Sequence, residues 1–232
     1  MSPSQIHLPQ PDAVVFDLDG TLVDTVKARI EAWMRVFAEE GIAADRHAVA
    51  ALIGSDGRRM ARVTAEAAGI SLEDGRDEAI DRRSGELYDE LNTDPQALPG
   101  AHRLLEALDG TSIGWAIATS SRREQTTASV AALALDVPPR IVDGSHVEHA
   151  KPAPDLLLRA AEELTVAPAR TWYVGDATWD MLAAVAAGMP AIGVTTGAVG
   201  TAELESSGAS LVVASLDELL AHMADAGLLR GD

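Results

Sequence analysis

Short apolar runs alternate with helical patterns through the second half of the chain, and this alternation constrains the fold most strongly. Each run is rich in Val, Ile or Ala and is closed by a small or polar turn. Such an order predicts a parallel sheet covered by helices on both faces. Together with one earlier run, six strands are predicted, at residues 13–16, 113–118, 140–142, 171–174, 191–194 and 211–213. We therefore predict an α/β fold with a doubly wound, Rossmann-like parallel sheet.

Helical patterns separate the later strands, and a longer helical stretch interrupts the alternation near the start. Residues 24–94 show apolar positions at helical spacing and no strand signal, so we expect an inserted all-helical cap domain there. The rest divides into an N-terminal tail at 1–11 and a core domain made of 12–23 and 95–232. The first expected helix ends near residue 40. The others lie at 46–53, 58–68, 72–91, 122–133, 154–164, 179–187 and 216–226.

Composition and charge exclude several classes of protein. The 232 residues are 47% hydrophobic, enough for a substantial core, and no apolar run approaches the ~20 residues of a membrane helix. The start lacks the basic and apolar regions of a secretory signal, and cysteine is absent. A net charge of −18 argues against nucleic acid or an anionic membrane as a partner. We expect a soluble cytoplasmic protein, either a monomer or a homodimer.

Two aspartates follow the first predicted strand, with one residue between them. Asp17 and Asp19 leave the run 13–16 side by side, and Gly20 marks a sharp exit from it. Like charges this close repel, so both stay ionised only if a cation is present or one proton is retained. Magnesium takes oxygen ligands of this kind, often together with substrate phosphate. An acidic turn that only solvates the strand end is the alternative interpretation.

Polar residues also follow the other predicted strands. Ligands of parallel sheets bind beyond the carboxyl ends of the strands, where the strand order reverses. Taken alone, each residue has an ordinary structural explanation, as a helix N-cap, a solvated lysine, a turn or a surface position. Their joint occurrence at successive strand ends favours a site for phosphoryl transfer. The residues are Thr119, Ser120, Ser121, Lys151, Asp176 and Asp180.

The chemistry of phosphoryl transfer predicts a role for each group. Asp17 is the expected nucleophile, which forms an aspartyl-phosphate. Asp19 is the expected general acid and base, which protonates the leaving alcohol and later deprotonates the attacking water. Thr119, Ser120 and nearby backbone N–H groups would bind phosphate oxygens, while Lys151 neutralises charge on the phosphate and the nucleophile.

Magnesium is the expected cofactor. Asp17 and Asp176 are the predicted ligands, with the backbone oxygen of Asp19 as a further one. For Asp180 three roles stay open: it binds the metal, orients the water molecules of the metal, or braces the loop.

Four motifs resemble those of the haloacid dehalogenase-like hydrolase superfamily, in the branch with a helical cap after the first strand. This branch contains phosphoglycolate phosphatases and beta-phosphoglucomutases. The resemblance covers residues 12–228 and implies a core domain like that of the superfamily. The motifs are Phe16 to Thr25, Ala118 to Ser121, Lys151 to Asp155 and Gly175 to Asp180.

The resemblance also separates the activities found in this superfamily. Dehalogenases lack the second aspartate of the first motif, so Asp19 indicates phosphate esters. Phosphonate hydrolases need a cap amine, and the only cap lysine, Lys27, lies beside the hinge. Phosphomutases usually have a Glu-Asp pair where this chain has Gly175-Asp176. We therefore predict a magnesium-dependent phosphatase of small phosphorylated metabolites. The alternative is a sugar phosphomutase of the beta-phosphoglucomutase type; a phosphonate hydrolase or a non-catalytic binding module is less favoured.

One stretch of the cap is a candidate for substrate recognition. A tight turn around Gly54 to Gly57 precedes Arg58 and Arg59, which would contact an anionic group of the substrate or simply solvate the start of a helix. Nothing in the cap specifies which metabolite is bound.

Overall fold

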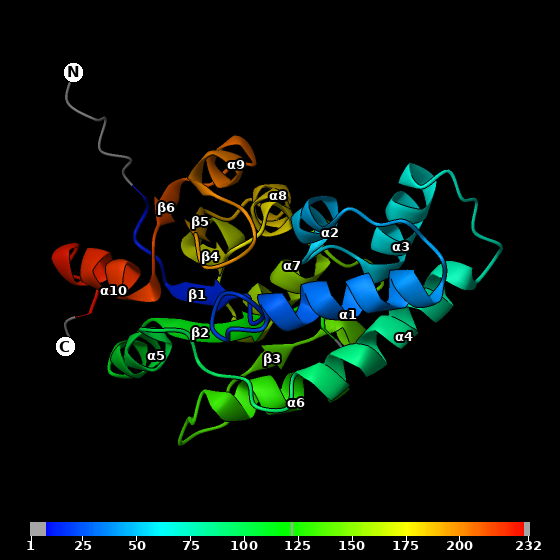
Figure 1. Cartoon of the computed structure of the whole chain (residues 1–232). Helices are drawn as coiled ribbons and strands as arrows, with labels where there is room; N and C mark the ends of the chain where they lie inside the picture. Colours follow the sequence, from blue (N-terminus) through cyan, green and yellow to red (C-terminus); the bar gives the residue numbers. More distant parts are fainter. Residues whose placement is uncertain (1–7, 122, 230–232) are drawn as a thin grey trace.

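A computed structural model describes residues 8–121 and 123–229 of the chain (Figure 1). Its centre is a six-stranded sheet in which every neighbouring pair is parallel, in the order β3-β2-β1-β4-β5-β6. The predicted α/β fold is confirmed, and each predicted strand agrees to within one residue. The strands are β1 (Ala13–Phe16), β2 (Gly114–Ala118), β3 (Ile141–Val142), β4 (Thr171–Gly175), β5 (Ala191–Val194) and β6 (Leu211–Val213).

Helices cover both faces of the sheet because alternate strand residues point to opposite sides. Val14 and Phe16 of β1 belong to one apolar cluster, and Val15 belongs to another. The first face carries α5 (Ala101–Asp109), α6 (Arg123–Ala132) and α10 (Leu216–Asp225); the second carries α7 (Asp155–Leu164), α8 (Thr178–Ala187) and α9 (Thr201–Ser206) (Figure 1).

The inserted helices form a body beside the carboxyl edge of the sheet. They have their own apolar cluster, in which Trp33 packs on Phe37 at 5.4 Å between ring centroids, with Met60, Ile80 and Tyr88 buried around them. We call residues 26–91 the helical unit. Its helices are α1 (Val26–Glu39), α2 (Arg46–Leu52), α3 (Gly57–Ala67) and α4 (Arg76–Leu91).

The helices differ from the predictions at several places. The helix expected at 72–91 begins only at Arg76, because Gly75 adopts the left-handed conformation at φ 79° just before it. Helices α5 and α9 were not predicted, although Ala101, Leu104, Leu105 and Leu108 have helical spacing and are buried. Arg122, the predicted start of the next helix, lies outside the described residues, as does most of the predicted tail. Among the helices that the structure describes, none has the length and apolar character to cross a membrane.

Candidate active site

Strands β1 and β4 are neighbours at the point where the strand order reverses, and both end in an aspartate. Asp17 follows β1, Asp176 follows β4, and Asp180 lies in the first turn of α8. One carboxylate oxygen from each lies within 4.8 Å of the others, and all three residues are buried. The structure thus brings together three predicted site residues that are up to 163 positions apart in the sequence.

Lys151 joins this cluster from the loop before α7. Its side chain is 1% exposed, and Nζ donates to Oδ1 of Asp17 and, at 2.8 Å, to Oδ1 of Asp180. Burial alone would lower the pKa of Lys151, but the two carboxylates outweigh burial and raise it. The lysine therefore stays an ammonium ion and offsets part of the acidic charge.

Asp180 has both carboxylate oxygens engaged by the protein. Oδ1 accepts from the Tyr173 hydroxyl at 3.0 Å, and Oδ2 accepts from the Ala177 backbone N–H at 2.9 Å. Gly175 is required for this packing, because a Cβ there would lie 2.5 Å from the Asp180 Cβ. This arrangement suits a carboxylate that holds Lys151 in place.

Asp17 and Asp176 differ from Asp180 because each has one carboxylate oxygen that accepts no hydrogen bond from a described residue. Thr21 donates to Oδ1 of Asp176 at 2.8 Å, whereas no described residue donates to Oδ2 of either aspartate. Burial raises the pKa of Asp17 to about 7 and that of Asp176 well above its ordinary value. Gly20 and Gly197 leave space beside Oδ2 of Asp176 that a Cβ would fill. Buried oxygen donors that resist ionisation without a counter-charge fit a hard divalent cation.

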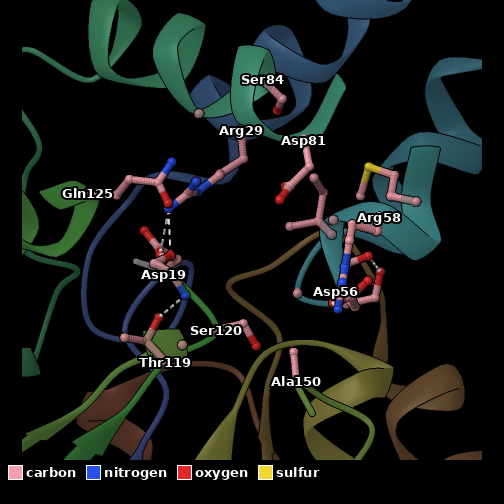
Figure 2. Close-up of a pocket in the computed structure, with 18 of the residues that line it drawn as sticks. Asp19, Arg29, Asp56, Arg58, Asp81, Ser84, Thr119, Ser120, Gln125 and Ala150 are labelled. Atoms are coloured by element: carbon pink, nitrogen blue, oxygen red, sulfur yellow. Dashed lines mark hydrogen bonds and ion pairs between the residues drawn. The ribbon is translucent and has the colours of Figure 1, made fainter. Parts of the chain in front are cut away.

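Asp19 lies outside this carboxylate cluster and links the core to the helical unit. Its Oδ1 accepts from Thr25 at 2.8 Å and from the Tyr88 hydroxyl at 3.1 Å. Its Oδ2 accepts from Arg29 at 3.1 Å (Figure 2) and also from the Ser121 hydroxyl. Burial would raise the pKa of Asp19, but Arg29 and the hydroxyl donors outweigh burial and lower it.

The loop after β2 carries the predicted phosphate ligands. Thr119 is buried, and its Oγ1 accepts from the Ser121 backbone N–H at 3.1 Å. The Ser120 Oγ is also buried, and no described residue hydrogen-bonds to it. An unpaired buried hydroxyl is costly, so this oxygen suits a bound ligand.

A cavity of about 270 Å³ lies between this loop and the helical unit. Figure 2 shows Thr119, Ser120 and Ala150 on one side, with Asp81 and Ser84 across from them. The two arginines proposed for substrate recognition lie in different places. Arg58 lines the cavity, whereas Arg59 lies over the Trp179 ring, with its guanidinium carbon 5.1 Å from the ring centroid.

Several residues at the site were not predicted. Arg29 and Tyr88 both contact Asp19, and the Arg29 guanidinium lies 3.5 Å from the Tyr88 ring centroid. Gln125 and Asp81 line the cavity. In the sequence, Tyr88 looks like one more apolar residue of an amphipathic helix, so its contact with Asp19 has no local signal.

Comparisons with known proteins agree with this geometry. A family model described as haloacid dehalogenase-like hydrolase matches residues 14–194. The fructose-1-phosphate phosphatase YqaB of Escherichia coli is 32% identical over 183 residues, covering 78% of this chain and 95% of that protein. A phosphoglycolate phosphatase of Rhodospirillum rubrum is 31% identical, covering 81% and 80%. A hydrolase from Pseudomonas syringae superimposes with a TM-score of 0.87 at 34% identity, covering 92% and 98%. The chain belongs to the haloacid dehalogenase-like hydrolase family.

Proposed function

We propose that this protein is a magnesium-dependent phosphatase that hydrolyses small phosphorylated metabolites through an aspartyl-phosphate intermediate. The observation that carries the proposal is the meeting of Asp17, Lys151 and Asp176 beside a cavity lined by Thr119 and Ser120. Nucleophile, counter-charge, metal donors and phosphate ligands are then within one site. Relatives whose names state phosphatase activity support the same reaction class.

In the first half-reaction, Asp17 attacks phosphorus and the bond between phosphorus and the leaving oxygen breaks. Lys151 donates to Oδ1 of Asp17 and so orients the carboxylate for the attack. Thr119 and Ser120 bind phosphate oxygens, and the unpaired Ser120 hydroxyl gains a partner. Asp19 gives a proton to the leaving alcohol.

In the second half-reaction, Asp19 accepts a proton from water, whose oxygen attacks the phosphorus of the aspartyl-phosphate. The bond to Asp17 breaks and inorganic phosphate leaves. Arg29 holds Asp19 as a carboxylate, so before it can donate, Asp19 must leave Arg29 and take up a proton from solvent; that proton then passes to the leaving oxygen. Because Arg29 and Tyr88 belong to the helical unit, we propose that residues 24–94 act as a cap that moves during the cycle.

Asp17 and Asp176 would hold Mg²⁺, together with the backbone oxygen of Asp19. When bound, the ion offsets the repulsion between the phosphate and the attacking carboxylate. Asp180 orients Lys151, since both its oxygens are already engaged. The crowding of Gly175 by Asp180 favours a hydrolase over the phosphomutase alternative, because the glutamate usual in phosphomutases has no room there.

A panel of phosphorylated metabolites, assayed for phosphate release with and without Mg²⁺, tests the proposal. We expect release only with Mg²⁺, and Asp17→Asn should reduce the rate by at least about 10³-fold with the fold intact. The matched control is Asp12→Asn, an exposed aspartate at the opposite end of β1 that pairs with Arg170. Phosphate isomers in place of free phosphate would indicate a phosphomutase, and substantial hydrolysis by Asp17→Asn would refute the assigned nucleophile.

A further inference from the structure

The cavity wall away from the reacting groups is acidic. Among the described residues that line the cavity, only Arg29 and Arg58 are cations. The lining acids beyond the reacting aspartates are Asp56, Glu78, Asp81 and Glu148. Three of these four acids come from the helical unit, so this unit sets the charge around the part of a substrate that lies beyond the phosphate.

Neither arginine adds uncompensated positive charge to this wall. Arg29 is 15% exposed and is engaged by Asp19 and, at 2.6 Å, by Ser121. Arg58 lies 3.7 Å from Asp56. Asp56 also accepts from the Arg59 backbone N–H at 2.9 Å, so its carboxylate is fixed at the start of α3. A second anionic group of a substrate would therefore meet paired cations and additional carboxylates.

The remaining polar groups of the wall suit hydroxyl groups. Ser55 and Ser84 contribute neutral hydroxyl groups, and carboxylates accept from hydroxyl donors. Two glycines make room for the wall. A Cβ on Gly85 would lie 2.6 Å from Nε2 of Gln125, and a Cβ on Gly57 would collide with the Asp81 carboxylate.

We propose that the substrate is the monophosphate of a neutral polyhydroxylated molecule, a sugar or a sugar alcohol, and that a second anionic group weakens its use. This inference rests on the proposed phosphatase function and deepens it. The hydroxyl groups donate to the carboxylates of the wall, whereas a carboxylate or a second phosphate in the same place is repelled by them. A phosphomutase, which must accept a bisphosphate, fits such a wall poorly.

Two substrates with the same number of carbons test the proposal directly. Glucitol 6-phosphate and 6-phosphogluconate each carry one phosphate, and the second has a carboxylate at its far end. We expect kcat/KM with Mg²⁺ to be at least about tenfold higher for glucitol 6-phosphate, because like charges at short range in a partly enclosed site repel by this order. Equal or better hydrolysis of 6-phosphogluconate would overturn the inference.

A general substrate separates this result from a failure of the proposed function. If 4-nitrophenyl phosphate and every metabolite release no phosphate, the phosphatase assignment fails. If phosphate is released but the anionic substrate is favoured, only the inference about the wall fails.

Two single variants change the wall charge in opposite directions. Asp56→Asn keeps the helix cap, since asparagine caps as well as aspartate, and leaves Arg58 without its paired charge. We expect the preference for glucitol 6-phosphate to fall about fivefold or more, and Arg58→Gln to increase it. The control is Asp45→Asn, which caps α2 through Ala48 in the same way but is not among the lining residues. If Asp56→Asn changes the ratio of the two kcat/KM values no more than this control does, the charge of the wall does not select the substrate.

Discussion

One ion pair of the core and one of the helical unit differ sharply in burial. In the core, Lys151 is almost fully buried and joins Asp17, which follows β1, to Asp180 in α8. In the helical unit, Arg83 is 37% exposed and pairs with Glu39 across two helices at the surface. A buried pair fixes the geometry of reacting groups, because neither partner can be replaced by water.

The largest expected difference between the two regions is in stability. Lys151→Met leaves Asp17 and Asp180 buried without their cation, which should cost about 3–5 kcal/mol and lower the Tm by about 10 °C at neutral pH. Arg83→Ala removes only surface contacts, and its Tm should match that of the unchanged protein within the error of the measurement. Thermal unfolding followed by circular dichroism, under identical conditions, measures both. Equal losses would show that burial does not distinguish the two pairs.

The same contrast explains which parts of the site the sequence predicts. In a parallel sheet all strands end at one edge, so Asp17, Lys151 and Asp176 could be placed together once the strands were recognised. The contacts of Asp19 with Arg29 and Tyr88 depend on how the helical unit packs on the core, which no local pattern specifies. Such contacts join residues 10 and 69 positions from Asp19 and come from separate helices.

Arg58 and Arg59 illustrate the same limit within one helix. Neighbouring positions on a helix point about 100° apart. Which of them faces the cavity is therefore set by the rotation of α3, and that rotation follows from the burial of Met60, Ala61 and Thr64 against the rest of the unit. The sequence indicates two candidate arginines at the start of this helix but does not specify which of them lines the cavity.

The effect of Mg²⁺ on stability should depend strongly on pH. Burial raises the pKa of Asp17 to about 7, so the metal-free folded protein retains protons that the unfolded chain, with a pKa near 3.9, releases. The protonated Asp17 carboxyl therefore favours the folded state. Its contribution to the free energy of unfolding is fully present below about pH 4 and is lost as the pH rises through about 7. Mg²⁺ requires ionised ligands, and we expect it to raise the Tm by several degrees at pH 8 and little at pH 5.5.

Thermal unfolding with EDTA or with Mg²⁺ at the two pH values measures this effect. Asp176→Asn should reduce the Mg²⁺-dependent shift at pH 8, because it removes one proposed ligand from the cluster. Among the described residues the helical unit contains no comparable group of carboxylates. A charge-neutralising change there, such as Asp45→Asn, should therefore leave the shift unchanged. An equal Mg²⁺ shift at both pH values would contradict a site built from Asp17 and Asp176.

The smallest expected effect tests whether the helical unit positions a reacting group of the core. Tyr88 donates to Asp19 at 3.1 Å and accepts from Asn92 at 2.8 Å, while its ring packs against Arg29. Tyr88→Phe keeps the ring and removes the hydroxyl. We expect kcat to fall about three- to tenfold with KM within about twofold, because one net hydrogen bond to a charged group is lost without loss of substrate contacts.

A change outside the site controls for the loss of an aromatic hydrogen-bond donor. Trp115 donates through Nε1 to Asp109 at 2.7 Å, and neither residue lines the cavity. Trp115→Phe should leave both kinetic constants unchanged. If Tyr88→Phe instead raises KM and leaves kcat unchanged, Tyr88 contributes to substrate binding, and the link from α4 to Asp19 has no part in proton transfer. A fall in kcat alone, together with a shift of the pH profile, supports positioning of Asp19, since a change that only loosened the helical unit would alter KM as well.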